Sequence, residues 1–222
     1  MDLSPQFILT NFFAIIISLT IHEFAHAWVA DRMGDPTPRR HDRLNLNPLT
    51  IIRAEPLGAF IVPLILSFTG SLFAWASTPV NPHLVHRKYT LRQAERWIAI
   101  AGPLSNAIFA LISALFYVLL VKYMPEEGEL TLWLAPLVPL MGALVYTNIV
   151  LALFNMIPVE PLDGFTVLES SLPRNLSHIT RMIRERRVLI FLFVFMFAGR
   201  LLGPIIYSTQ MVLIGFFAQL VG

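Results

Sequence analysis

The sequence His-Glu-Phe-Ala-His at residues 22–26 places two imidazoles four residues apart, with a carboxylate beside the first. On a helix, residues i and i+4 lie one above the other on the same face, about 6 Å apart along the axis. His22 and His26 can therefore reach one metal ion at the ~2.0–2.1 Å that zinc–nitrogen bonds require. Glu23 lies next to them, where its carboxylate can take a proton from a water that the metal activates.

These three residues lie near the end of an apolar run, residues 7–30, which is long enough to cross a bilayer. Each ionisable group near the middle of such a span costs ~2.5–3.5 kcal/mol on insertion scales. A chance motif, or polar residues that bond between helices, is the alternative, but a cluster of three is costly without a function. The motif predicts a metal site.

A catalytic zinc usually has three protein ligands and one open position. The stretch "FNMIPVEPLDGF", residues 154–165, contains the best candidate for the third ligand, Asp163. Pro158 and Pro161 cannot sit comfortably inside a helix, and Gly164 permits a tight turn. We therefore expect Asp163 on irregular backbone at the membrane edge; a turn aspartate in water is the alternative. The other histidines lie in basic, hydrophilic connections: His41, His83, His86 and His178.

The composition is that of a membrane protein. Of the 222 residues, 56% are hydrophobic and 14% charged, whereas soluble domains carry about 25% charged residues. The chain has no cysteine, and its net charge of +2 gives no indication of a nucleic-acid partner. The N-terminus lacks the basic leader of a signal peptide, so the first apolar run is interpreted as a retained span.

The apolar segments predict an all-α polytopic membrane protein, with residues 1–222 in a single integral-membrane domain. Three segments form its core spans: residues 7–30, 96–121 and 132–157. Two further hydrophobic segments are accessory: residues 57–76 and 188–222. The second of these is either a helical hairpin or one kinked span, and the sequence does not decide between them.

Basic residues gather in the connections 31–56, 83–96 and 174–187, whereas the connection "KYMPEEGEL" is acidic. Positive-inside bias places the three basic connections in the cytoplasm. Residues 57–76 would then begin and end on the same side, as a re-entrant or short extended membrane-associated segment. An ordinary span that violates the charge rule is the alternative.

The metal site favours the re-entrant arrangement too. The two histidines lie toward the end of the first span, and Asp163 follows the end of the span 132–157. They can meet only if these two spans run in the same direction. That requires one crossing, residues 96–121, between them.

Three motifs in this order resemble the site-2 protease family of intramembrane zinc metalloproteases: "HEFAH" at 22–26, "AGPLSN" at 101–106 and "NMIPVEPLDG" at 155–164. The resemblance covers most of the chain, whose length is similar to that of compact prokaryotic members. It implies one zinc ion per chain held by His22, His26 and Asp163, with Glu23 as general base. It also implies a catalytic role for Asn155 in holding the substrate or its oxyanion.

The same resemblance implies a substrate-binding or structural role for a further set of positions: Asn47, Pro48, Gly102, Pro103, Asn106, Pro158 and Pro161. The chain departs from the family pattern at "NPLTIIRAEPLG", residues 47–58, which has two extra residues. In this segment, Glu55 is a candidate replacement for the family's aspartate, and Arg53 is a candidate replacement for the family's histidine. Glu160 stands where proline is common.

Together these observations predict a zinc metalloprotease of the cell (inner) membrane that hydrolyses peptide bonds within or near the transmembrane segment of a membrane-spanning protein. Its active site would lie toward the cytoplasmic side. The unwound substrate would pair with an extended segment of the protein, for which residues 38–56 and 76–84 are candidates and an irregular loop is the alternative. A non-catalytic family member, or a metal-binding transporter or scaffold, is the competing interpretation. The substrate and the oligomeric state are not determined by the sequence.

Overall fold

The computed structural model describes residues 4–68, 75–125 and 127–222. All regular elements in these ranges are helices, and four helical segments are long and apolar enough to cross a membrane. They are α1 (Pro5–Met33), α5 (Leu91–Tyr123), α6 and α7 (Glu129–Leu134 and Leu137–Asn155) and α10 (Arg187–Val221). The prediction of an all-α polytopic membrane protein is confirmed.

The outer faces of the long helices are apolar. Leu104 on α5 is 52% exposed, and Leu189 and Leu201 on α10 are 72% and 67% exposed. Contiguous apolar surface of this kind is rare on monomeric soluble proteins, and a bilayer covers it without cost. The exposed side chains are therefore those of a protein surrounded by lipid.

Helix α1 extends the predicted span 7–30 at both ends. It begins where the Ser4 hydroxyl accepts a hydrogen bond from the backbone N–H of Phe7 at 3.2 Å, with Pro5 in the first turn. It ends at Gly34, whose φ of 107° is the left-handed conformation typical of a helix terminus. The second half of α1 carries the histidine motif.

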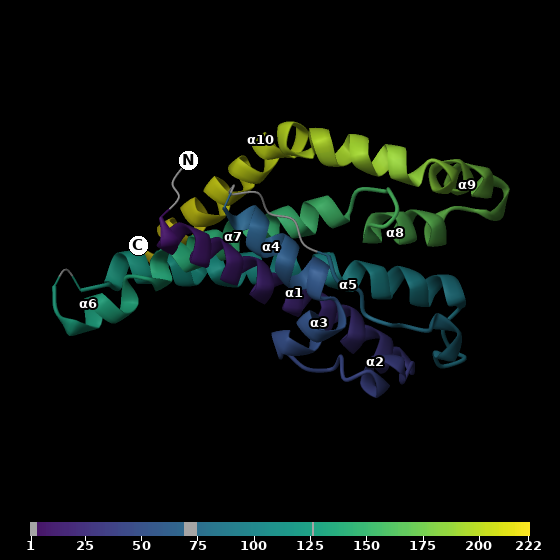
Figure 1. Ribbon diagram of the computed structural model, residues 1–222, viewed down its shortest axis with the longest axis horizontal. Coiled ribbons are helices and arrows are strands. Elements are labelled where there is room, and N and C mark those ends of the chain that lie inside the picture. Colours follow the sequence, from purple (N-terminus) through teal and green to yellow (C-terminus); the bar gives the residue numbers. More distant parts are fainter. Residues whose placement is uncertain (1–3, 69–74, 126) are drawn as a thin grey trace.

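Helices α1, α5 and α7 form the centre of the molecule (Figure 1). Ala110 and Ala114 on α5 pack against Val145 and Ile149 on α7. Small residues at such a contact allow two helix backbones to approach closely within a membrane. The span predicted at 132–157 is broken between α6 and α7, at residues 135–136.

The hydrophobic segment 57–76 does not form a crossing helix in its described part. The π-helical turn η1 (Leu57–Ile61) and α4 (Val62–Ser67) together rise roughly 17 Å, less than the ~30 Å of a bilayer's hydrocarbon core. The N–H of Trp75 donates to the carbonyl of Gly58 at 3.2 Å, so the two ends of the segment lie side by side. This is the arrangement predicted for a re-entrant segment; residues 69–74 lie outside the described residues.

The C-terminal segment is one helix rather than a hairpin. Helix α10 runs for 35 residues and contains Pro204, and Figure 1 shows it change direction along its length. A proline inside a helix removes a backbone donor and commonly bends the helix. The kinked-span alternative is therefore the correct one for residues 188–222. The remaining elements are short: α2 (Thr37–Arg40), α3 (Pro48–Ala54), η2 (Pro82–Leu84), α8 (Asp163–Ser171), η3 (Arg174–Leu176) and α9 (Ser177–Glu185).

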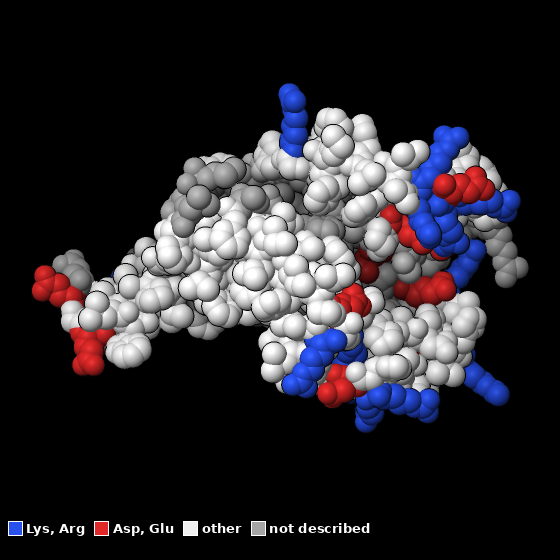
Figure 2. All heavy atoms as spheres, in the orientation of Figure 1, with Lys and Arg blue, Asp and Glu red and all other residues white. Residues whose placement is uncertain are grey.

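Charged side chains collect at the two ends of the long helices (Figure 2). Basic side chains gather around α2, α3 and α9, with acidic side chains among them, whereas acidic side chains predominate at the opposite end, near α6. The basic connections 31–56, 83–96 and 174–187 thus share one end of the molecule, as the re-entrant interpretation of residues 57–76 requires.

Candidate metal centre

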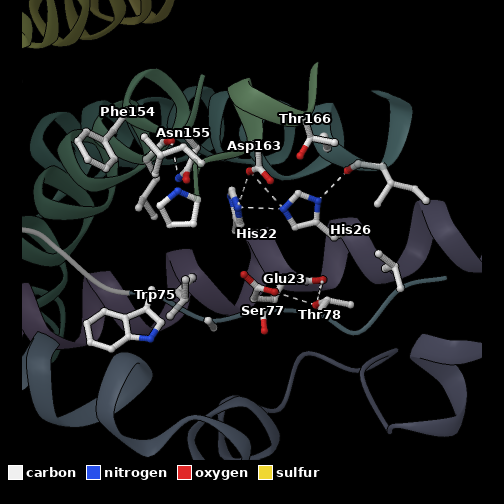
Figure 3. A pocket seen from close by; sticks show the side chains of 18 of the residues that line it. His22, Glu23, His26, Trp75, Ser77, Thr78, Phe154, Asn155, Asp163 and Thr166 are labelled. Atoms are coloured by element: carbon white, nitrogen blue, oxygen red, sulfur yellow. Dashed lines mark hydrogen bonds and ion pairs between the residues drawn. The ribbon is translucent and has the colours of Figure 1, made fainter. Parts of the chain in front are cut away.

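The histidine motif of α1 faces α5 and the first turn of α8 (Figure 3). His22, Glu23 and His26 are 5%, 4% and 8% exposed. Their placement follows from local sequence, because a continuous helix puts residues 22 and 26 on one face. The residues that cover that face belong to two other segments, α5 and α8, which lie about 80 and 140 residues later in the chain.

Three ligand-type atoms form a small triangle. His22 Nε2 lies 3.0 Å from His26 Nε2, and Asp163 Oδ2 lies 3.2 Å from the first and 3.4 Å from the second. Ligands of a tetrahedral zinc ion, each at ~2.0–2.1 Å from the metal, lie about 3.3 Å from one another. Asp163 Oδ2 is buried and has no hydrogen-bond partner. The residues present therefore fit a zinc ion.

Each imidazole is oriented through its other ring nitrogen. His22 Nδ1 lies 2.6 Å from Asn106 Oδ1, and His26 Nδ1 lies 2.7 Å from the carbonyl oxygen of Ile98. Both partners are acceptors, so each Nδ1 carries the proton and donates it. This leaves both Nε2 lone pairs free for a metal, the usual arrangement of metal-binding histidines.

Asn106 belongs to a buried polar network, of which the sequence motifs indicated only Asn106 itself. Its Nδ2 donates to Asn148 Oδ1 at 2.7 Å and to the carbonyl of Ser18 at 3.2 Å. Asn148 Nδ2 in turn donates to Ser18 Oγ at 2.8 Å. The network joins α1, α5 and α7 and holds His22 in place. The signal for Asn148 was an amide in an otherwise apolar span, because such residues usually bond between helices.

Asp163 reaches the triangle through the break that Pro158 and Pro161 were predicted to cause. Residues 156–162 lie outside regular helix, but Asp163 itself is the first residue of α8, not part of the irregular stretch as expected. A side chain on Gly164 would lie 2.6 Å from the carbonyl oxygen of Ile157. Glycine therefore permits the close return of the chain that brings Asp163 inward.

The Asp163 carboxyl is in its charged form at neutral pH. Burial by itself would raise its pKa, but the adjacent His26 and His22, when they are protonated, outweigh burial and hold the pKa below its ordinary value. The carboxylate is the form that binds a metal.

Gly102 on α5 forms the floor beneath the two imidazoles. A Cβ at this position would lie 2.6 Å from His22 Nε2 and would also collide with His26 Nε2. The α5 backbone can therefore approach the ligand atoms only because residue 102 has no side chain. This gives Gly102, predicted as substrate-binding or structural, a direct packing role at the metal centre.

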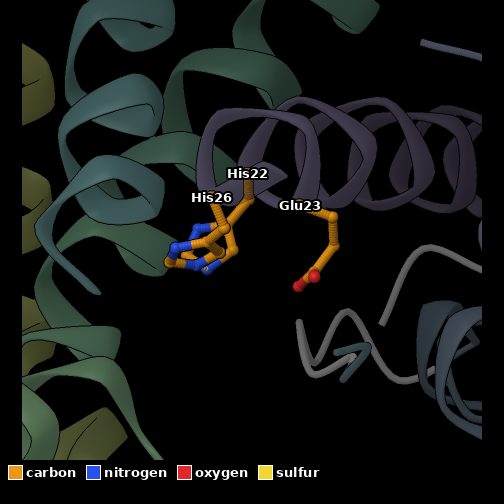
Figure 4. A group of neighbouring side chains, drawn as sticks. All are labelled: His22, Glu23 and His26. Atoms are coloured by element: carbon orange, nitrogen blue, oxygen red, sulfur yellow. Dashed lines mark hydrogen bonds between the residues drawn. The ribbon is translucent and has the colours of Figure 1, made fainter. Parts of the chain in front are cut away.

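Glu23 lies beside the imidazoles rather than between them (Figure 4). Its carboxylate is within 4.8 Å of the ligand atoms of both histidines. The hydroxyl of Thr78 lies 2.8 Å from Glu23 Oε2 and 3.0 Å from the Glu23 carbonyl oxygen, and it donates its proton to this residue. No motif in the sequence indicated Thr78, which is 55 residues away in the chain.

Thr78 belongs to residues 75–81, which have no regular secondary structure. This segment is fastened by Glu55, whose Oε1 accepts from the N–H of Ser77 at 2.8 Å and from its hydroxyl at 2.6 Å. Of the two segments predicted to meet a substrate, residues 76–84 border the site. Residues 38–56 contain α2 and α3 instead of extended backbone.

A cavity of about 400 Å³ opens onto the metal triangle and Glu23. Trp75, Thr78, Asn155 and Pro161 also line it. Asn155 is the last residue of α7, and its Nδ2 donates to the carbonyl of Leu151 at 3.0 Å. One N–H of that amide remains available to a ligand in the cavity.

Besides Gly102 and Asn106, four predicted positions do not line this cavity. Asn47 caps α3, where its Oδ1 accepts from the N–H of Leu49 at 3.0 Å, and Pro48 is the first residue of that helix. Pro103 is buried inside α5, and Pro158 lies in the irregular stretch after α7. These four residues thus lie at the start of a helix, inside a helix or in the break after α7.

Comparison with known proteins identifies the family. Residues 10–133 match the model of Peptidase family M50. "Putative zinc metalloprotease YwhC" of Bacillus subtilis is 34% identical over 174 residues, which cover 78% of this chain and 72% of the relative. "Regulator of sigma-E protease RseP" of Escherichia coli is 29% identical over 113 residues, which cover 45% of this chain but only 23% of that protein. No solved structure matches the chain.

The matched region is more than half of the 222 residues, and the similarity to YwhC exceeds 30% identity over most of both chains. It contains the histidine motif and the middle motif that carried the resemblance. The chain therefore belongs to Peptidase family M50, the site-2 protease family.

Proposed function

We propose that this protein is an intramembrane zinc metalloprotease that hydrolyses peptide bonds within or near the transmembrane segment of a membrane protein. The family and the names of its relatives support a membrane zinc metalloprotease. The observation that carries the finer proposal is the triangle of His22, His26 and Asp163 atoms, 3.0–3.4 Å apart, with Glu23 next to it in a buried cavity.

His22, His26 and Asp163 would hold the zinc ion. When bound, zinc supplies Lewis acidity and lowers the pKa of water to ~7. The three ligands come from α1 and α8, so the site depends on the packing of both helices against α5. Asn106 and the Ile98 carbonyl keep the imidazole protons on Nδ1, away from the metal side.

Glu23 acts as general base. Its carboxylate faces the cavity, accepts the proton of the attacking water and returns it to the leaving amine. The Thr78 hydroxyl holds one carboxylate oxygen, Oε2, by its hydrogen bond, which leaves Oε1 to meet the water. Thr78 is thus a positioning residue for the base.

The substrate must present an extended backbone, because a helix hides its peptide groups in internal hydrogen bonds. Residues 75–78 border the cavity and offer an irregular segment along which an unwound substrate can pair by strand addition. The free N–H of the Asn155 amide can then donate to the developing oxyanion, a contribution of ~2.7–4 kcal/mol in other enzymes.

The basic connections 31–56, 83–96 and 174–187 support a cytoplasmic position for the end of the molecule that contains the site. The apolar outer surface supports a cell-membrane location. Water would reach the cavity from this polar end, and the substrate would enter from the bilayer.

The test compares Glu23→Gln and Asp163→Asn variants with the unaltered protein in membranes. Glu23→Gln should retain stoichiometric zinc but produce no cleaved fragments of membrane proteins, measured by proteomics of fragment termini. Asp163→Asn should lower zinc content and cleavage together. Glu129→Gln on α6, at the opposite end of the molecule, is the control and should change neither. Full cleavage by Glu23→Gln would exclude its assignment as base, and unchanged zinc content in Asp163→Asn would exclude the third ligand.

A further inference from the structure

A second concentration of positive charge lies away from the metal centre, where α9 meets α10 (Figures 1 and 2). A hollow of about 430 Å³ opens at this junction. Four arginines line it: Arg181, Arg184, Arg186 and Arg187. The only acid among its lining residues in the described chain is Glu185, so the hollow has a net positive charge.

The hollow also contains exposed apolar side chains. Val188 and Leu189, which complete its lining, are 63% and 72% exposed. On the neighbouring α9, Ile179 and Met182 are 37% and 55% exposed. An amphipathic basic helix with exposed apolar residues is typical of a segment at the boundary between lipid headgroups and acyl chains.

The position of the hollow at the start of α10 agrees with a location at the boundary between headgroups and acyl chains. Measured along its bent axis, the helix is ~52 Å long at 1.5 Å per residue, whereas the hydrocarbon core of a bilayer is ~30 Å thick. Its first turns, which begin at Arg187, therefore extend into the headgroup region at the basic end of the molecule.

Only some of the charges of these arginines are neutralised within the protein. Arg184 forms a close ion pair with Glu169, with Nη2 and Oε2 2.7 Å apart. Arg184 and Arg187 lie 3.6 Å and 3.5 Å from the carboxylate of Glu160, longer than the ~2.7–2.9 Å of a strong charge-assisted hydrogen bond. Arg181 and Arg186 form no ion pair with any residue in the described ranges.

We propose that this hollow binds the phosphate of an anionic phospholipid headgroup. Guanidinium groups suit phosphate because they offer paired N–H donors to its oxygens. Arginine clusters immediately before a membrane helix are a common basis for anionic-lipid recognition. Val188 and Leu189 would contact the acyl chains of the same lipid, and this contact distinguishes a lipid from a soluble phosphate.

Glu160 competes with the lipid for Arg184 and Arg187. It lies three residues before Asp163, in the irregular stretch between α7 and α8. Lipid occupancy is therefore coupled to the stretch that leads into the proposed third zinc ligand, Asp163. The effect of this coupling on cleavage rests on the proposed function, but the binding of lipid does not.

The experiment measures lipid selectivity without an activity assay. The full chain is reconstituted into phosphatidylcholine bilayers, and spin-labelled phosphatidylglycerol or phosphatidylcholine is added in trace amounts. The fraction of immobilised label gives the relative association constant of the two lipids. We expect at least a threefold preference for phosphatidylglycerol.

The Arg181→Gln/Arg186→Gln double variant should lose this preference, because it removes the two arginines without an ion pair. Glu160→Gln should increase the preference, because it removes the competing carboxylate. Arg87→Gln/Lys88→Gln changes the net charge equally in another basic connection and should leave the preference unchanged. Equal loss in this control and in the arginine variant would mean diffuse attraction to the surface and would overturn the proposal.

A competition experiment with soluble glycerol phosphate distinguishes a lipid headgroup from a soluble phosphate as the ligand of the hollow. Millimolar glycerol phosphate should not displace the labelled phosphatidylglycerol, because it lacks acyl chains. Displacement would assign the hollow to a soluble phosphate and refute the lipid proposal. Zinc content, measured on the same samples, should be the same in all variants, so failure of the lipid site and failure of the metal centre are distinguishable.

Discussion

The sharpest prediction concerns Gly102→Ala, a change of one methyl group beneath the two imidazoles. The new Cβ would lie 2.6 Å from His22 Nε2 and closer still to His26 Nε2. Carbon contacts are normally at least ~3.5 Å, so the helices or the rings must separate by at least about 0.9 Å, the difference from the His22 distance. A misplacement of about 1 Å can cost ~10²-fold in rate.

The helix itself should tolerate the substitution. Alanine has a higher helix propensity than glycine, by ~0.8–1.0 kcal/mol. Gly142→Ala on α7 is the matched control, because its Cβ would lie 3.5 Å from Tyr117 Cε2, an ordinary contact. Both variants replace a glycine inside a membrane helix, but only Gly102→Ala places a new methyl group against the ligand nitrogens.

The assay combines zinc stoichiometry of the purified protein with cleavage of membrane proteins. We expect Gly102→Ala to lose bound zinc and to cleave at least ~10²-fold more slowly, whereas Gly142→Ala retains both. If Gly102→Ala binds zinc stoichiometrically and cleaves at the normal rate, Gly102 does not set the geometry of the ligands.

Three further predictions follow from contacts around the site. Thr78→Val should slow cleavage by about tenfold to a hundredfold, since a hydrogen bond to a charged group contributes ~1.5–3 kcal/mol. The zinc content and the KM of this variant should not change. Thr78→Ser, which keeps the hydroxyl, should restore kcat. A Thr78→Val variant with normal kcat would contradict the role of Thr78 in holding Glu23. Asn148→Ala leaves buried groups of Asn106 and Ser18 unpaired and should destabilise the fold by ~1–3 kcal/mol, seen as a lower Tm; an unchanged Tm would mean that water replaces the amide. Removal of metal with a chelator should abolish cleavage, and zinc, but not magnesium, should restore it, because the site offers two nitrogen ligands; recovery with magnesium would contradict a zinc centre.

The atypical segment 47–58 has a structural explanation at one position. Glu55 accepts both the N–H and the hydroxyl of Ser77 and so fastens residues 75–78 beside Glu23. Its carboxylate therefore serves to position this segment. Nothing in the structure explains the presence of Arg53 in the same segment.

The sequence by itself determined the parts of the protein that depend on local periodicity. Apolar runs long enough to cross a bilayer predicted the core spans. A helix satisfies all of its backbone hydrogen bonds internally, as the hydrocarbon core of a membrane requires. The i, i+4 spacing of His22 and His26 fixed their common face. Pro158 and Pro161 predicted the break after α7, and the direction of the spans predicted that Asp163 would meet the histidines.

Only the tertiary structure decided the contacts between distant segments. Asn148 and Ser18, 130 residues apart, share a hydrogen bond because α1 and α7 pack together. Thr78 meets Glu23 because the backbone at Trp75 lies against that of Gly58. No periodic pattern in the sequence predicts such contacts, because each contact depends on how several helices pack against one another. The candidate zinc ligands could be predicted from their types and spacing, whereas the residues that orient them became evident only from the packed fold.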